Sequence, residues 1–272
     1  MSTPRAYDVR TENVSVDSEI QRLYYQANLN PAKEARVLSA FGLRDGMSLL
    51  EVASGPGFVT EWLGGLVPSG SITCVEIDPI LTEHAEKYLT GKLLCPLKIV
   101  EGSLLNMEFP DNTFDFAYAR LIFEHLPDPV AGVREIMRVL KPGGKLVIAE
   151  GDAAFNNITD PHFAALQPLR EKLIEYQSSL GGNTMIGRRL WRALKAAGLE
   201  SLDIEAVVAH SGDTGLERFA AQFNPDRLKP LVGQGVISRE ELEYYRNLIT
   251  EFFAGNDVFY LRILLMVCGR KP

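Results

Sequence analysis

Cysteine is scarce in this sequence. Only three cysteines occur in 272 residues, Cys74, Cys95 and Cys268, and none forms a CxxC pair or stands near a histidine at metal-ligand spacing. Scattered thiols of this kind are typical of buried side chains in a reducing compartment, and they argue against a disulfide framework. We also expect no metal site.

Long basic runs and long apolar runs are absent as well. The formal net charge is −7 and no Lys/Arg-rich stretch offsets it, which argues against a nucleic-acid partner. No segment reaches the roughly 18–20 uninterrupted apolar residues of a membrane span. Residues 1–13 are polar and lack the apolar centre of a signal peptide. We therefore expect a soluble, cytoplasmic protein.

The chain contains instead an alternation of strand-like and helix-like segments. Asn-Pro and Asp-Pro pairs favour the start of a helix. Five such pairs occur, at Asn30-Pro31, Asp78-Pro79, Asp128-Pro129, Asp160-Pro161 and Asn224-Pro225. β-Like runs cover residues 47–53, 71–77, 97–100, 114–119, 145–150, 202–209 and 258–267. Strands that alternate with helices predict a doubly wound, parallel α/β sheet.

Some segments fall outside this alternation, although we expect one compact domain overall. Residues 1–45 are predicted to form an N-terminal helical cap. Residues 152–182 and 211–256 are predicted as helical lid insertions, because structureless loops of that length are uncommon. A capping box from Ser238 to Glu241 supports a helix in the second insertion. The core then consists of residues 46–151, 183–210 and 257–272.

A glycine turn follows the first predicted strand. Residues 49–57 read Leu-Leu-Glu-Val-Ala-Ser-Gly-Pro-Gly, and a helix-like segment starts at Phe58. A strand, a glycine turn and a helix bring backbone close to a nucleotide-like ligand at the carboxyl end of the strand. We expect Gly55 and Gly57 to leave room where a Cβ would strike that ligand.

An acidic residue ends the second predicted strand. Glu76 stands 19 residues after Gly57, where a carboxylate can accept hydrogen bonds from both ribose hydroxyls of an adenosine. Asp78 is interpreted as the cap of the next helix. After the third strand, the side chain of Ser103 can reach an adenine amino group. A Lys141-Pro-Gly-Gly turn precedes the fifth strand.

Taken together, these motifs resemble those of class I S-adenosylmethionine-dependent methyltransferases, in the broad small-molecule group that includes ubiquinone/menaquinone-type C-methyltransferases. The match covers roughly residues 16–210 in order, and the final strand fits the reversed seventh strand of the family. The resemblance implies a Rossmann-like, doubly wound seven-stranded sheet of order 3-2-1-4-5-7-6. Strand seven would be antiparallel, and helical lid insertions would cover the site.

The resemblance also implies a cofactor site. Glu51 to Gly57 would hold the methionine part of S-adenosylmethionine, Glu76 the ribose, and Ser103 with Leu104 the adenine. Arg120 and Leu121 would approach the cofactor and face the substrate. The N-terminal segment Arg22-Leu-Tyr-Tyr-Gln26 resembles one that closes over the methionine end. The implied cofactor residues are Tyr24, Gln26, Glu51, Ala53, Ser54, Gly55, Gly57, Glu76, Ile77, Ser103, Leu104, Arg120 and Leu121.

Two positions depart from the family pattern. Ala53 replaces the first glycine of the turn, which keeps a small residue there. Ser103 replaces an aspartate, and its hydroxyl is a weaker acceptor for the adenine amino group.

Methyl transfer asks mainly for alignment, because the sulfonium already makes the methyl group electrophilic. A general base helps if the nucleophile is a hydroxyl or an acidic carbon. His125, just past the fourth strand, and Asp152, just past the fifth, are the candidates. The alternatives are local packing of His125 in its His-Leu-Pro turn, and a helix-capping or solvated role for Asp152.

Other functions fit less well. A dehydrogenase would have glycine at the position where this sequence has Thr60. A DNA methyltransferase would have an Asn/Asp-Pro-Pro-Tyr segment after strand four, which this sequence lacks. One rival uses the same motifs: a protein that binds S-adenosylmethionine but assists a rearrangement, cyclisation or decarboxylation. We expect methyl transfer to a small, apolar or aromatic metabolite, with S-adenosylhomocysteine as product. A homodimer is left open.

Overall fold

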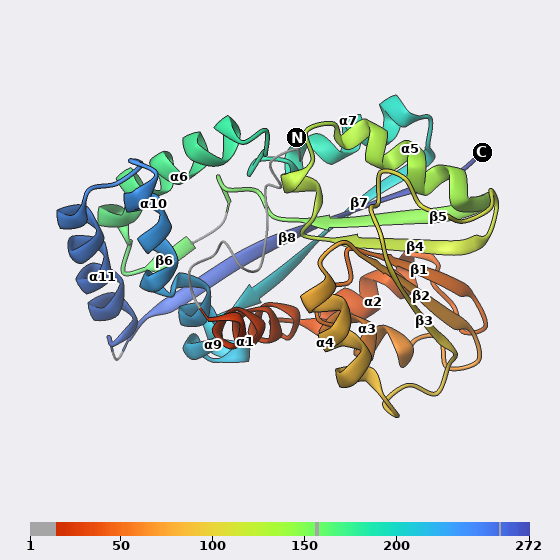
Figure 1. The fold of residues 1–272 in the computed structure, drawn as a ribbon, viewed down its shortest axis with the longest axis horizontal. Coiled ribbons are helices and arrows are strands. Elements are labelled where there is room, and N and C mark those ends of the chain that lie inside the picture. The colour runs from red at the N-terminus through yellow and green to blue at the C-terminus, as the bar shows by residue number, and fades with distance from the viewer. Residues whose placement is uncertain (1–14, 156–157, 256) are drawn as a thin grey trace.

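The computed structural model describes residues 15–155, 158–255 and 257–272. A mixed sheet runs through the centre of the described chain (Figure 1). Its strands follow the order β3-β2-β1-β4-β5-β8-β6, and β7 pairs with β8. The parallel strands are β1 (Ser48–Val52), β2 (Ser71–Glu76), β3 (Leu97–Glu101), β4 (Phe114–Arg120) and β5 (Leu140–Glu150).

The last part of the sheet is antiparallel. β8 (Phe259–Arg270) runs antiparallel to β5, to β7 (Glu200–His210) and to β6 (Ile158–Asp160). β8 and β7 take the places predicted for strands seven and six, which confirms the fold class and the strand order. The predicted strand number was wrong by one, because the three-residue β6 lies in a segment that was expected to be helical.

β8 is longer than its pairing with β5 requires. Its pairing with β5 ends at Glu150 opposite Leu265. Residues 259–264 therefore continue past the carboxyl end of β5, where they pair with β6 and β7. This extension lies at the edge of the sheet where parallel α/β proteins bind their ligands.

Helices cover both faces of the sheet (Figure 1). One buried cluster joins the sheet to α5 (Pro129–Val139) and α7 (Leu190–Ala197). A second joins the opposite face to α2 (Pro31–Phe41) and α3 (Phe58–Gly64), with α1 (Val16–Ala27) packed against it. Leu49 points to the second cluster and Leu50 to the first, as the two-residue period of a strand requires.

The Asn/Asp-Pro predictions hold at four of five places. Pro31 and Pro129 begin α2 and α5, Pro79 begins α4 (Pro79–Leu89), and Pro225 begins the 3-10 turn η5 (Pro225–Leu228). The prediction was wrong at Asp160-Pro161, because Asp160 closes β6 and the next helical turn, η2 (Ala164–Leu166), begins later.

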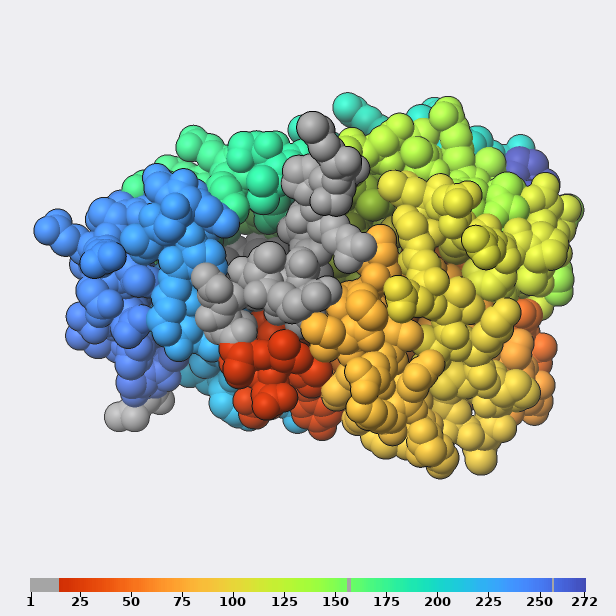
Figure 2. Space-filling model, in the orientation of Figure 1, coloured from red at the N-terminus to blue at the C-terminus, as the bar shows by residue number. Residues whose placement is uncertain are grey.

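A separate group of helices packs beside the sheet, and we call it the distal lobe. It consists of α6 (Gln167–Ser179), α10 (Lys229–Gly233) and α11 (Arg239–Phe253) together with η2 and η5, and it has its own buried cluster. The predicted capping box at Ser238 begins α11. In Figure 2, α1 lies between the distal lobe and the α4 side of the core. A lid role for this lobe stays a prediction.

Short elements complete the described chain. They are η1 (Phe123–His125), η3 (Gly187–Arg189), α8 (Ser211–Thr214), α9 (Leu216–Ala220) and η4 (Ala221–Phe223). Within residues 15–155, 158–255 and 257–272, no helix combines the length and the apolarity that crossing a membrane requires.

Candidate functional site

The glycine turn leaves the carboxyl end of β1 and enters α3. Its backbone is left-handed at Ala53, Gly55 and Gly57, with φ of 54°, 57° and 89°. A Cβ built on Gly55 meets no described atom within 4 Å. Gly55 thus borders open space on the side where the ligand was expected.

Gly57 has a different reason to be glycine. A Cβ there would lie 2.9 Å from Leu89 Cδ1 and 3.3 Å from Ala85 Cα, both in α4. Its small size allows α4 to pack on the turn. The expectation that a Cβ on Gly57 would strike the ligand was therefore wrong, because the space beside it is filled by protein.

Ala53 adopts a left-handed φ although it is neither glycine nor asparagine. That conformation costs an L-residue about 1–2 kcal/mol. Leu121, directly after β4, shares this feature with a φ of 54°. Two strained residues thus lie at the carboxyl edge of the sheet, and strain of this kind is concentrated at functional sites.

Glu76 is held beside the glycine turn. Its Oε2 accepts the Gly55 N–H at 2.8 Å, and its Oε1 accepts the N–H groups of Ile77 and Asp78 at 2.8 and 2.9 Å. Burial raises the pKa of this carboxyl, and the three N–H donors oppose that effect. Asp78 caps α4 as predicted, by accepting the Ile80 N–H.

The residues next to Glu76 and those after the end of β3 differ in how far their side chains are exposed to solvent. Ile77 is 41% exposed, so it offers an apolar surface next to the carboxylate. Ser103 Oγ accepts the Leu105 N–H at 3.2 Å and is only half-buried. Leu104 is buried in the core beneath α5, so only its backbone can face a ligand. The assignment of adenine to Leu104 therefore cannot involve its side chain.

Glu51 lies under the turn. The carboxyl is buried in β1, and Thr60 Oγ1 of α3 donates to its Oε2 at 2.6 Å. Burial raises the pKa of Glu51 to about 7, against the lowering effect of the Thr60 and Cys74 hydrogen bonds. This residue fastens the first turn of α3 to β1 and can change its charge near neutral pH. Ser54, which lies in the turn itself, is buried as well, with 6% of its surface exposed.

Arg120 joins three elements at the end of β4. Its guanidinium donates to both carboxylate oxygens of Glu34 at 2.8 and 3.0 Å, and to the Gln26 carbonyl at 3.1 Å. Tyr118 Oη also donates to Glu34, at 2.8 Å. Arg120 thus ties β4 to α1 and α2. Sequence reasoning missed Glu34, for which the available signal was an acid in the first turn of a helix that starts at Pro31.

This network sets α1 against the glycine turn. The Tyr24 ring packs edge-on against Phe58, the first residue of α3, with centroids 5.2 Å apart. Tyr24 itself remains 44% exposed. Arg22, in the same helix, is paired with Glu19 and donates to Gln222 at 2.8 Å. The N-terminal segment expected at the methionine end is thereby placed next to Phe58, directly after the glycine turn.

The two candidate bases have different surroundings. Asp152 is almost fully buried and accepts two hydrogen bonds from the Arg188 guanidinium at 2.6 and 2.7 Å. Burial raises the pKa of Asp152, but these bonds outweigh it and hold the pKa below its usual value. This pairing favours a structural role. His125 lies in η1, with its Nε2 3.6 Å from a Glu124 oxygen.

A second missed acid, Glu150, ends β5 beside this turn. Its Oε1 accepts the N–H groups of Ile122 and Phe123 at 2.7 and 2.5 Å. Its Oε2 is buried and has no hydrogen-bond partner among the described residues. Burial and the charge of Glu124 raise the pKa of Glu150 well above its usual value. Glu150 therefore shapes the turn that carries His125.

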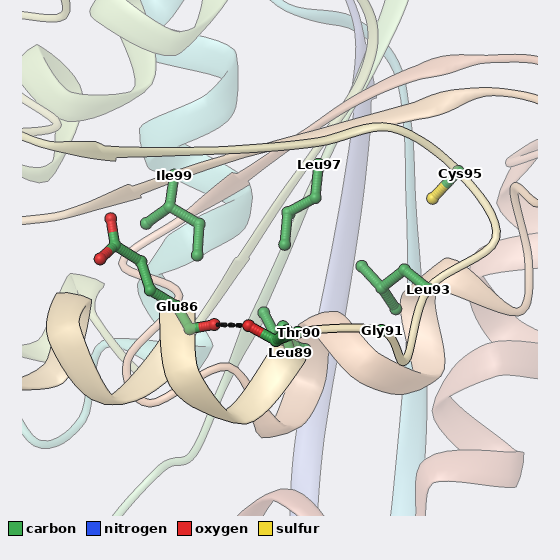
Figure 3. A pocket seen from close by; sticks show the side chains of 8 residues that line it. All are labelled: Glu86, Leu89, Thr90, Gly91, Leu93, Cys95, Leu97 and Ile99. Atoms are coloured by element: carbon green, nitrogen blue, oxygen red, sulfur yellow. Dashed lines mark hydrogen bonds between the residues drawn. The ribbon is translucent and has the colours of Figure 1, made fainter.

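A hollow elsewhere on the surface is unrelated to these residues. Figure 3 shows it between the last turn of α4 and the beginning of β3. The hollow is lined by Glu86, Leu89, Thr90, Gly91, Leu93, Cys95, Leu97 and Ile99. Leu97 begins β3, whereas Ser103 follows its end, so the hollow lies toward the opposite edge of the sheet. No cluster of metal ligands occurs in the described part of the chain.

Comparison with known proteins places this site in context. Residues 50–148 match the model of the methyltransferase domain family. A demethylmenaquinone methyltransferase of Geobacillus sp. is 28% identical over 141 residues, which are 50% of this chain and 60% of that protein. The chain spans about half the length of the curated relatives it matches.

Solved structures share the fold over most of the chain. A protein of Bacillus halodurans C-125, provisionally described as a methyltransferase, has a TM-score of 0.57 and 19% identity, with 88% of this chain and 98% of that chain covered. The [4+2]-cyclase SpnF has a TM-score of 0.55 and 21% identity, with 88% and 81% covered. The family model and the curated relatives confirm the resemblance to class I S-adenosylmethionine-dependent methyltransferases, and the solved structures show the shared fold.

The glycine turn gives a matched test of ligand space. Gly55→Ala should weaken S-adenosylmethionine binding more than tenfold, because the new Cβ enters the space left for the ligand. Gly46→Ala is the control, since Gly46 also has a positive φ and no described atom near its Cβ, but precedes β1. Both variants carry the same backbone cost of about 1–2 kcal/mol. Equal affinities of the two variants in calorimetric titration would refute this placement.

The carboxylate of Glu76 can be tested separately. Glu76→Ala should weaken S-adenosylmethionine binding by more than tenfold, because it removes the carboxylate that is proposed to accept from the ribose hydroxyls. Glu83→Gln, on the exposed side of α4, should leave the affinity unchanged. An unaltered affinity in a folded Glu76→Ala protein would show that the ribose binds elsewhere.

Glu51 predicts a pH dependence of stability. In the unfolded chain this carboxyl ionises near 4.5, whereas the folded protein keeps its proton until about pH 7. The protonated carboxyl therefore stabilises the folded protein fully below pH 4.5, and this stabilisation is lost as the pH rises through 7. The loss in the free energy of unfolding is about 3 kcal/mol at most. Glu51→Gln should reduce the fall in unfolding free energy between pH 5 and 8, measured by urea denaturation. The exposed Glu83→Gln should leave that fall intact, and an unchanged slope in Glu51→Gln would contradict the assignment.

Proposed function

We propose that this protein is an S-adenosylmethionine-dependent methyltransferase that methylates a small, apolar or aromatic molecule by in-line displacement. One observation carries the proposal. The carboxylate of Glu76 is fixed by three backbone N–H groups beside Gly55, whose Cβ position is open. A ribose acceptor and an open glycine turn, on adjacent parallel strands, form an adenosine site.

The cofactor residues of this proposal follow the carboxyl edge of the sheet. The methionine part would lie over Ser54 and Gly55, with Tyr24 and Gln26 of α1 on its other side. The ribose would bind Glu76, and the adenine would rest on exposed Ile77 near Ser103. The bound cofactor would supply an electrophilic methyl group. The chain would contribute binding, orientation and exclusion of water, which are the main requirements of such a displacement.

His125 is the general base of this proposal where the acceptor must lose a proton. It lies just past the carboxyl end of β4, and its Nε2 is 3.6 Å from a carboxylate oxygen of Glu124. Asp152 is a weaker candidate, because its carboxylate is already occupied by Arg188.

The quinone methyltransferases among the relatives favour an apolar, quinone-like acceptor. The non-transferring use of the cofactor has no comparable support, because the likeness to SpnF concerns the fold alone. The substrate therefore belongs in the class of small organic metabolites.

Titration and turnover together test this function. Calorimetry should show micromolar binding of S-adenosylmethionine and S-adenosylhomocysteine and no binding of NAD. Incubation with labelled S-adenosylmethionine and a panel of phenols and hydroquinones should transfer the label and release S-adenosylhomocysteine in equal amounts. Binding without transfer across the panel, or product formation without consumption of the cofactor, would instead support the non-transferring use. NAD binding with silence from both sulfur ligands would overturn the cofactor assignment.

A further inference from the structure

Arg262 lies on the part of β8 that continues past the sheet core. The last β5–β8 pair joins Glu150 to Leu265, and Arg262 is three residues further along, opposite Ala209 of β7. At about 3.3 Å per residue, it stands about 10 Å beyond the end of β5. The residue is therefore on the acceptor side of the proposed methyl-transfer site.

The alternation of β8 shows which face Arg262 occupies. Leu264 and Met266 belong to the buried cluster beneath α1, α2 and α3. Arg262 shares their face, because it is separated from them by two and four residues. Besides Tyr260, two residues away on β8, the groups whose charges act on its guanidinium are Arg120 of β4, Glu124 of η1 and Arg22 of α1.

The neighbouring arginines have carboxylate partners, whereas Arg262 does not. Arg22 is paired with Glu19 at 2.6 Å and Arg120 with Glu34 at 2.8 Å. Among residues 15–155, 158–255 and 257–272, Arg262 makes neither a hydrogen bond nor an ion pair. Glu124 is the acid whose charge acts on it, and the carboxylate of Glu124 lies 3.6 Å from His125 Nε2.

Such a residue is costly to keep. Arg262 is half-buried, and burial lowers the pKa of its guanidinium, although arginine stays charged at neutral pH. A partly desolvated charge without a counterion destabilises a folded protein. A residue with this cost at the acceptor side is explained if a ligand supplies the missing negative charge.

We propose that Arg262 binds a carboxylate group of the methyl acceptor, which makes the substrate an apolar or aromatic acid. The planar guanidinium matches a carboxylate in a two-bond geometry. Tyr260, two residues away on the same face, packs against Phe219 with ring centroids 4.7 Å apart, so a buried apolar cluster lies next to the charge. This inference rests on the proposed function for the identity of the reaction, but the anion preference can be measured without it.

The first test compares the binding of an aromatic carboxylate with that of its uncharged amide analogue. Naphthalene-2-carboxylate should bind at least tenfold more tightly than naphthalene-2-carboxamide, by calorimetry with and without saturating S-adenosylhomocysteine. Arg262→Met should abolish this preference and leave the affinity for S-adenosylhomocysteine unchanged. Arg270→Met is the control, because Arg270 lies on the same strand but is exposed and paired with Glu200. Equal affinities in the unaltered protein, no binding of the acid, or a preference that survives Arg262→Met would each overturn the proposal.

The second test separates a ligand-binding role from a structural one. If Arg262 lacks a partner in the free protein, Arg262→Met should raise Tm in the absence of ligand. A lower Tm would show that the guanidinium stabilises the fold, and the proposal would be wrong. Failure of the proposed function has a different signature: the acid preference would persist while neither S-adenosylmethionine nor S-adenosylhomocysteine bound.

Discussion

The buried contact between Arg120 and Glu34 holds the candidate site together. The pair lies between the end of β4 and the first turn of α2, and Tyr118 and the Gln26 carbonyl complete its hydrogen bonds. Removing one member of a buried pair typically costs about 3–5 kcal/mol, because the other charge is then left without a partner. The position of α1 over the glycine turn depends on this contact.

The buried acids around the site have two different roles: one is placed to bind a ligand, and the others hold the surrounding segments in place. Backbone N–H groups hold the Glu76 carboxylate at the open glycine turn, whereas Glu51 and Glu150 are buried acids that fasten the segments around it. Both kinds of acid carry a raised pKa, but only Glu76 borders the space left at Gly55. Buried acids alone would therefore be a poor guide to the ligand.

Much of the fold could be predicted because its signals are local. Strand periodicity, the glycine turn and the helix caps at Asp78 and Asp128 depend on neighbours within a few residues. Features that depend on distant partners could not be predicted in this way. Glu34 meets Arg120 across 86 positions, and β6 has only three residues, too few for a periodic signal. The reason for glycine at position 57 became visible only once α4 was placed against it.

The place of β8 in the sheet has a consequence for the order in which the protein assembles during synthesis. β8 is the last strand along the described residues, yet it lies between β5 and β7, and β7 has no other strand partner there. Ribosomes deliver the amino-terminal part first. The edge of β5 and the whole of β7 thus remain open until residues 259–270 emerge. An unpaired strand edge is a template for association with other chains, so the nascent protein passes through a stage in which it needs protection.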